Sequence, residues 1–366
     1  MTTVVKHKRL WIGLIGSVIC VLGVLGTYFD AGLYQQPIIR VTRVQTISRE
    51  KQTDEYQNED TEVVQRVTGQ FLNTKQKGQV ITLRNTYTAS QAMSTRYYKG
   101  QQVFLHRDQY LKKWTLNEPK RDTIIVGLTL LTFSFLLLMM LKRGLMTLIS
   151  VLVNLVAFVL TLHLNAMTGG RWLLPIMCGL AVVLTGLTLL LVLGPNRQML
   201  VSYGATIGAT FLALFLSMAV LKLTGDQGLH YETMAYELQP YKTVFLAEVV
   251  LGILGAVMDE TTDISSSLQQ LAIERPNVTK TELFKSGLAI GREIIGPLVN
   301  VLFFLVMADA FPIILLYLRN GNTIAYTLSR TVTLSFTQTV ISAIGITLAV
   351  PVTSLLASQL VRVRRL

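Results

Sequence analysis

Residues 123–141 read TIIVGLTLLTFSFLLLMML, and residues 145–166, after a short Lys-Arg-Gly turn, read LMTLISVLVNLVAFVLTLHLNA. A helix needs roughly 20 apolar residues to cross a bilayer core about 30 Å thick. Both runs come near that length, and the charged residues Lys142 and Arg143 lie between them rather than inside them. The two runs therefore predict a pair of membrane-spanning helices joined by a tight turn.

The composition of the whole chain indicates the same class. Of the 366 residues, 51% are hydrophobic and 15% are charged, and the mean hydropathy is +0.48. Soluble domains usually have about 25% charged residues. Six further stretches approach spanning length, at 11–29, 172–193, 199–221, 243–258, 288–308 and 332–357. We therefore predict an α-helical polytopic membrane protein with about eight transmembrane helices.

The chain divides into three parts. Residues 1–30 join a basic start to an apolar run that is longer than the roughly 7–15 residues of a cleavable signal, so we expect a retained N-terminal signal-anchor helix. Residues 31–121 are polar, with β-favouring runs at 38–44, 63–72, 80–87 and 102–106 separated by turn signals. This spacing predicts a small β-rich domain of about five strands, as a barrel or a sandwich. Residues 122–366 form the predicted multi-pass membrane domain.

The Lys and Arg residues of the short loops predict the orientation. With the N-terminus inside, the inner segments carry most of them, whereas the short outer segments carry Arg171, Lys222, Lys242, Arg319 and Arg330. Both termini are then cytoplasmic, residues 31–121 are extracytoplasmic, and the main partner is the lipid bilayer. The net charge of +12 is partly a consequence of this topology. A nucleic-acid interface would need a clustered basic face with aromatic platforms, which the sequence does not show.

The sixth apolar segment carries a stripe of polar and small residues. Its members are spaced 4, 3, 4, 4, 3 and 4 residues apart, so one continuous helix places them on one face: Glu248, Gly252, Gly255, Asp259, Asp263, Ser266 and Gln270. A charged side chain at the centre of a bilayer costs roughly 2.5–3.5 kcal/mol. We expect the two glycines to pack against a neighbouring helix and the carboxylates to line a substrate or ion pathway. The alternative is that the helix leaves the membrane near Met258, so that Asp259, Glu260 and Asp263 are simply solvated.

A second polar group follows on the next helix. Thr279 and Glu282 form a capping box at its start, and Gly287 and Gly291 allow close helix packing. Gly296-Pro297 should kink or break the helix and free a backbone carbonyl. Polar groups beside a broken helix commonly form transporter sites, so Arg292, Glu293 and Asn300 join the predicted pathway. Arg292 and Glu293 are equally compatible with an interfacial pair.

Two motifs in these helices resemble a known family. Gly255-Ala256-Val257-Met258-Asp259 with Ile264-Ser265-Ser266-Ser267-Leu268, and then Ile290-Gly291-Arg292-Glu293-Ile294-Ile295-Gly296 before Asn300, are similar to the signatures of YibE/F-like bacterial membrane proteins. The resemblance covers a core of roughly residues 122–318, and members with an anchor and a β-rich extension resemble the rest. It implies the bacterial cytoplasmic membrane, and a second YibE/F-like multi-pass subunit or a homo-oligomer. It implies no particular activity.

Three functions are compatible with these features. The chain has no P-loop, GxGxxG, HExxH or Cys/His cluster, and Cys20 and Cys178 fall in predicted spans, so we expect no cofactor, no metal and no catalytic residue. The leading hypothesis is a permease-like transporter, coupled to protons or cations through Glu248, Asp259 and Glu293. The alternative is a non-transporting envelope scaffold or a subunit of a two-component membrane complex. An intramembrane hydrolase using Asp259 with Asp263 or Glu248 is the third possibility, and the least supported.

Overall fold

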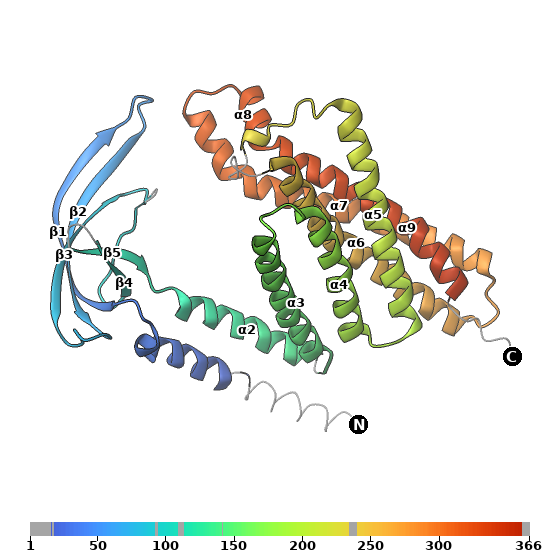
Figure 1. Cartoon of the computed structure of the whole chain (residues 1–366), viewed down its shortest axis with the longest axis horizontal. Coiled ribbons are helices and arrows are strands. Elements are labelled where there is room, and N and C mark those ends of the chain that lie inside the picture. The colour runs from blue at the N-terminus through green and yellow to red at the C-terminus, as the bar shows by residue number, and fades with distance from the viewer. Residues whose placement is uncertain are drawn as a thin grey trace. The chain divides into compact units, whose positions relative to one another are not determined.

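The computed structural model describes residues 16, 18–91, 94–108, 113–140, 142–233 and 240–360. The chain divides into two compact units, Met1–Leu145 and Met146–Leu366. The first unit contains the sheet and the second contains the large helical bundle (Figure 1). Each unit has its own hydrophobic core.

The first unit contains one antiparallel sheet of five strands in the order β3-β2-β1-β4-β5. Its strands are β1 Ile38–Thr53, β2 Glu59–Phe71, β3 Val80–Thr88, β4 Gln102–Arg107 and β5 Trp114–Pro119. Alternation of apolar side chains places Ile39, Val41, Val67 and Val103 in its core. β1 is longer than its apolar run predicted, because its polar second half pairs with β2 across two register shifts. A single sheet with β3 and β5 at its edges takes the place of the expected barrel or sandwich.

A buried lysine joins the ends of the sheet region. The Lys120 side chain is 1% exposed, and its amine contacts carboxylate oxygens of Asp30 at 2.5 Å and Asp122 at 3.0 Å. The Tyr34 hydroxyl donates to Asp122 Oδ2 at 2.7 Å, and this hydrogen bond raises the pKa of Tyr34 to about 12. The phenol therefore remains a hydrogen-bond donor at physiological pH. Asp30 begins the short 3-10 helix η1, Asp30–Leu33, and Asp122 begins α2, so the chain enters and leaves the sheet region at one place.

Seven helices of the described residues are long and apolar enough to cross a membrane. They are α2 Asp122–Met140, α3 Lys142–Met167, α4 Leu173–Leu193, α5 Arg197–Thr224, α6 Tyr241–Glu274, α7 Lys280–Arg319 and α9 Thr333–Leu360. The predicted combination of apolar helices with an N-terminal antiparallel sheet is confirmed. The first predicted span, 11–29, lies partly outside the described residues, and its described part belongs to a shorter apolar helix, Val18–Leu33. The count of eight spans stays a prediction.

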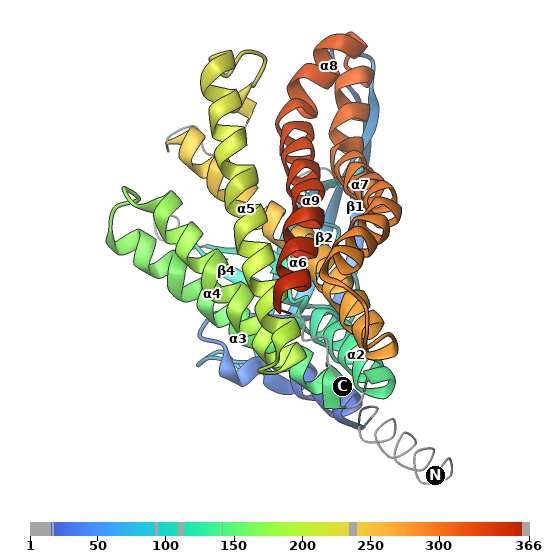
Figure 2. The ribbon, with the colours of Figure 1, turned by 90° about the vertical axis from the view of Figure 1, so that its right-hand side faces the viewer.

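In the second unit α9 lies between α5 and α7 (Figure 2), and α6 packs against α4, α5 and α9. Small residues permit this close packing, since an added Cβ at Gly345 of α9 would lie 2.7 Å from Ile253 of α6. The described part of the unit also contains two short helices, η2 Tyr231–Thr233 and α8 Ile324–Thr331. The buried faces of α5, α6 and α9 thus pack together in one hydrophobic cluster.

Candidate functional site

The predicted stripe on α6 lies on an exposed face. α6 is one continuous helix of 34 residues, as the stripe requires. Glu248, Gly255, Asp259 and Asp263 are exposed, and Gly252 is half-buried. The buried side of the helix carries Ile253, Val257, Ile264 and Leu268 instead. The carboxylates of Asp259 and Asp263 therefore point away from the core of the second unit.

The polar residues of α7 also point away from the bundle. Gly291 faces Val350 of α9 at close range, whereas Asn300 lies nine residues later. At about 100° per residue, nine residues make two and a half turns, so Asn300 lies on the opposite side of the helix from Gly291. Arg292, Glu293, Gly296, Pro297 and Asn300 are all exposed. Within the described residues, no ion pair or hydrogen bond joins them to the α6 stripe.

Of the predicted kink or break in α7, the break is wrong, because the helix continues through Pro297 and Pro312 over 40 residues, and the kink stays a prediction. Proline has no N–H, so Pro297 leaves the carbonyl of Glu293 without its usual helical donor. The neighbouring carbonyl of Gly296 accepts a hydrogen bond from Asn300 Nδ2 at 3.0 Å. The freed carbonyl therefore lies on an exposed face of an intact helix rather than at the end of a half-helix.

Glu248 lies in a cavity of about 670 Å³ between α6, α7, α8 and α9. The polar side chains that line it come from five elements of the second unit, η2, α6, α7, α8 and α9: Glu232, Thr233, Glu248, Asp309, Tyr317, Tyr326, Arg330, Thr331, Ser335 and Gln338. Gln338 reaches across to Gly252, where its Nε2 atom lies 2.8 Å from the place an added Cβ would take. Of the predicted pathway residues, this cavity contains Glu248 alone, and it adds Asp309 from the far end of α7.

One basic residue in this cavity is already paired. Arg330 contacts the carboxylate of Glu232, which also lies 2.9 Å from His230 Nδ1. The hydrogen bond from its own backbone N–H, followed by the one from His230, lowers the pKa of Glu232. Among the described residues, Glu248 and Asp309 have no ion-pair partner. The cavity therefore has an excess of negative charge, contributed by these two carboxylates.

Among the described residues, the most deeply buried carboxyl group is that of Glu260, which is 1% exposed. Neither of its carboxyl oxygens has a hydrogen-bond partner among the described residues. It continues the buried side of α6, three residues after Val257 and four before Ile264. Val257 contacts Gly345 of α9. The Glu260 side chain thus lies on the face by which α6 packs into the bundle.

A ladder of hydroxyl groups lies between α5 and α6, and one of its members, Thr261, follows Glu260 in the sequence. Ser202 Oγ lies 2.6 Å from Ser265 Oγ, and Thr206 Oγ1 lies 2.7 Å from Thr261 Oγ1. Four residues after Thr206 on α5, the Thr210 hydroxyl is buried and has no partner in the described chain. Hydroxyls at four-residue spacing hold two helices together in an apolar medium. Here they also form a polar strip through an otherwise apolar interface.

Among the described residues, no lysine or arginine forms an ion pair with Glu260. The described residues of α4 and α9 contain no charged side chain, and α5 has Arg197 and Lys222 near its ends only. Thr206, which pairs with Thr261, is nine residues from Arg197, or roughly 14 Å along the helix. On α7, Arg292 is exposed and has no ion-pair partner in the described residues. The charged neighbours of Glu260 on α6 are the carboxylates of Asp259 and Asp263.

Sequence reasoning left Glu260 open between a functional and a solvated residue and favoured Asp259 as the functional one, whereas the structure buries Glu260 and exposes Asp259. The signal was present, since Ile253, Val257, Glu260, Ile264 and Leu268 are spaced 4, 3, 4 and 4 residues apart and form the apolar face. The cavity residues Asp309 and Gln338 come from distant segments, and no local pattern links them to Glu248. The pathway role of Asp259, Asp263, Arg292, Glu293 and Asn300 stays a prediction.

The described residues contain no group of three or more His, Cys, Asp or Glu side chains that could hold a metal ion. Comparison with protein families gives two matches. A model described as YibE/F-like protein matches residues 128–363, and one described as YibE/F family N-terminal domain matches residues 32–118. No curated protein and no solved structure matches the chain.

Proposed function

We propose that this chain, which belongs to the YibE/F-like family, is a permease-like membrane transporter in which Glu260 binds and releases the coupling proton or cation. The observation that carries the proposal is the Glu260 side chain, 1% exposed and without a hydrogen-bond partner in the described residues. An ionised carboxylate in such a place is costly unless a proton or a cation neutralises it. Ionisable groups inside membrane helices commonly mark ion and proton pathways.

The surroundings of Glu260 favour reversible binding of a proton or a cation. A permanent partner such as lysine or arginine would fix the carboxylate as a structural ion pair, and the described parts of α4, α5 and α9 supply none at this level. The hydroxyls of Thr206 and Thr261 offer oxygen ligands along the α5–α6 interface. Small shifts between α6 and its neighbours would then expose the carboxyl group to water. This is the behaviour that alternating access requires.

The cavity around Glu248 and Asp309 provides a polar entrance from one end of the bundle. Its two unpaired carboxylates would attract a cation before it reaches Glu260. With the predicted orientation, this entrance opens to the outside, both termini are cytoplasmic, and residues 31–121 are extracytoplasmic. The membrane is the bacterial cytoplasmic membrane in this proposal. The substrate itself is not specified by any of these residues.

Adjacent residues of α6 give the decisive test. The full chain is reconstituted in liposomes, and uptake of a panel of ions and metabolites is measured with and without a pH gradient. Glu260→Gln should abolish gradient-driven uptake while expression and thermal stability stay close to wild type, because the amide keeps the volume of the side chain. Asp259→Asn, on the exposed side of the same turn, is the matched control. Full uptake by Glu260→Gln together with loss in Asp259→Asn would overturn the role given to Glu260.

A second candidate function is a subunit of a larger membrane complex. Asp259, Asp263 and Arg292 are exposed on helices of spanning length, and such residues normally face a protein interior or a water-filled cavity. A second copy or a second YibE/F-like multi-pass subunit would cover them. Cysteine introduced at Gly255 should then form cross-links in membranes, in a chain whose Cys20 and Cys178 are replaced. Cysteine at Leu200, an exposed apolar position on α5, is the control, and equal cross-linking at both sites would count against the interface.

A further inference from the structure

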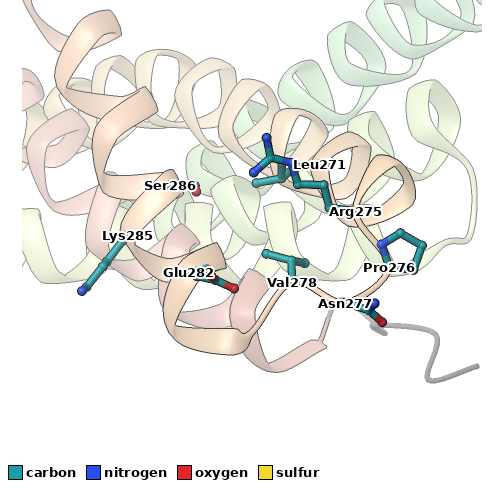
Figure 3. Close-up of a pocket in the computed structure, with 8 residues that line it drawn as sticks. All are labelled: Leu271, Arg275, Pro276, Asn277, Val278, Glu282, Lys285 and Ser286. Carbon is teal, nitrogen blue, oxygen red and sulfur yellow. The ribbon is translucent and has the colours of Figure 1, made fainter.

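The connection between α6 and α7 forms one side of a second cavity, which is open to the surface and has a volume of about 550 Å³. Its lining combines two basic residues with small polar and apolar ones: Leu271, Arg275, Pro276, Asn277, Val278, Glu282, Lys285 and Ser286 (Figure 3). The connector is held in one shape, because Arg275 N–H donates to the Leu271 carbonyl and Val278 N–H donates to the Arg275 carbonyl. The cavity is therefore a feature of an ordered turn.

Neither cation of this cavity is held in an ion pair with a described residue, although both lie near enough to the Glu282 carboxylate to interact with it electrostatically. Among the described residues, Arg275 and Lys285 form no ion pair. The one carboxylate in the lining, that of Glu282, accepts hydrogen bonds from the Thr279 N–H and hydroxyl, each at 2.8 Å, in the capping box of α7. The Glu282 carboxylate therefore points toward the start of α7. The net charge that the lining offers a ligand is positive.

The arrangement suits a phosphate group. Figure 3 shows the Arg275 guanidinium turned toward Ser286 on α7, while Lys285 extends outward from the same helix. A guanidinium binds a phosphate through two parallel N–H donors, and a serine hydroxyl can donate a third hydrogen bond. The flexible stem of lysine lets its amine close over the ligand from the rim.

The position of the cavity indicates which phosphate compound it meets. It lies at the joined ends of two helices that are long and apolar enough to span a membrane. Its lining includes the apolar side chains of Leu271 and Val278, and Ile273 beside it is 64% exposed. A free phosphate gains nothing from contact with apolar side chains, whereas a phospholipid has glycerol and acyl carbons next to its phosphate that can pack against them. Basic pockets at helix ends attract anionic headgroups in this way.

We infer that the α6–α7 cavity, lined by Arg275, Lys285 and Ser286, is a binding site for the headgroup of an anionic phospholipid. The site is independent of the transport proposal, since it uses none of the residues around Glu260. Bound lipid would fix the angle between the two helices that carry the polar stripe and the glycine contacts.

The test uses the purified full-length protein in a neutral detergent. Native mass spectrometry measures retention of phosphatidylglycerol, with phosphatidylcholine as the neutral comparison. Wild type should retain phosphatidylglycerol preferentially. The Arg275→Gln/Lys285→Gln double variant should bind it roughly 25-fold more weakly, because each basic residue is expected to contribute roughly fivefold. Lys280→Gln is the matched control, because Lys280 is exposed on the first turn of α7 and does not line the cavity.

Three outcomes would overturn the inference. The first is equal phosphatidylglycerol retention by wild type and the double variant, with folding of both checked by circular dichroism. The second is an equal loss of phosphatidylglycerol retention in Lys280→Gln, which would mean that the basic surface attracts the lipid without a defined binding site. The third is full displacement of the lipid by millimolar inorganic phosphate, which would make a free phosphate the ligand.

Discussion

Glycines that lie on similar helical faces differ in what surrounds them. An added Cβ at Gly291 would lie 2.3 Å from Val350 Cγ1, and one at Gly287 would lie 2.3 Å from Ser354 Oγ. At Gly255 and Gly296 nothing in the described chain lies within 4 Å of that position. The helical repeat makes all four glycines look alike as packing residues. Only the neighbouring helix α9 distinguishes them, because it contacts the first pair.

Gly291→Ala should therefore destabilise the protein. Valine is stiff about its first side-chain torsion, so Val350 cannot easily move aside, and overpacking costs roughly 1–3 kcal/mol. The higher helix propensity of alanine offsets at most about 1 kcal/mol of this. We expect a lower melting temperature and a lower folded yield in detergent. Gly255→Ala and Gly296→Ala should match or exceed wild type; a loss as large as that of Gly291→Ala would indicate that another chain packs on that face.

At the level of elements, the lengths of α6 and α7 matter most. They have 34 and 40 residues, so at about 1.5 Å per residue each exceeds the roughly 30 Å hydrocarbon core. Their joined ends thus extend beyond a single crossing, which gives the α6–α7 connection room to form its cavity. In the first unit, the junction of η1, β5 and α2 depends on a single buried amine, that of Lys120.

Lys120→Met should weaken this junction. Removing one partner of a buried ion pair costs roughly 3–5 kcal/mol. The loss here should be smaller, because the Asp30 and Asp122 side chains remain 16% and 26% exposed. The substitution leaves two carboxylates close together without a cation. We expect the sheet to unfold at a lower temperature, as monitored by the fluorescence of Trp114. The control Lys99→Met, at an exposed turn, should unfold at the wild-type temperature. Unfolding of Lys120→Met at the wild-type temperature would show that the cluster does not hold the sheet.

At the level of the whole molecule, the two compact units differ in composition and in packing, and the ends of the sheet region lie together at Lys120. A region whose two ends meet can be removed with little effect on the remainder. Replacement of residues 36–117 by a short Gly-Ser linker should leave the second unit folded, as judged by monodisperse gel filtration. A transporter should then keep some uptake, whereas a scaffold that acts through its sheet should lose all function in cells. Loss of the folded second unit would contradict the independence of the two units.

Orientation is also tested on the whole molecule. With Lys and Arg on the inner side, cysteine at Lys75 should react with a membrane-impermeant thiol reagent in intact cells, and cysteine at Asn277 should react only after lysis. Both positions are exposed in the structure. The parent chain, with Cys20 and Cys178, gives the background. Labelling of Asn277→Cys from outside would overturn the predicted topology.

Local properties of the sequence determined the helices, the sheet and the family, because apolar run length, two-residue alternation and motif spacing all act within short segments. The α6 stripe on one face of a continuous helix and the capping box of α7 were predictable for the same reason. The periodicity of α6 placed Glu260 on the apolar face, but its burial depended on the helices packed against α6, whose contacting residues lie far away in the chain. Only tertiary packing decided that Glu260 is enclosed while Asp259 is exposed, because the burial of a side chain is a property of every helix around it.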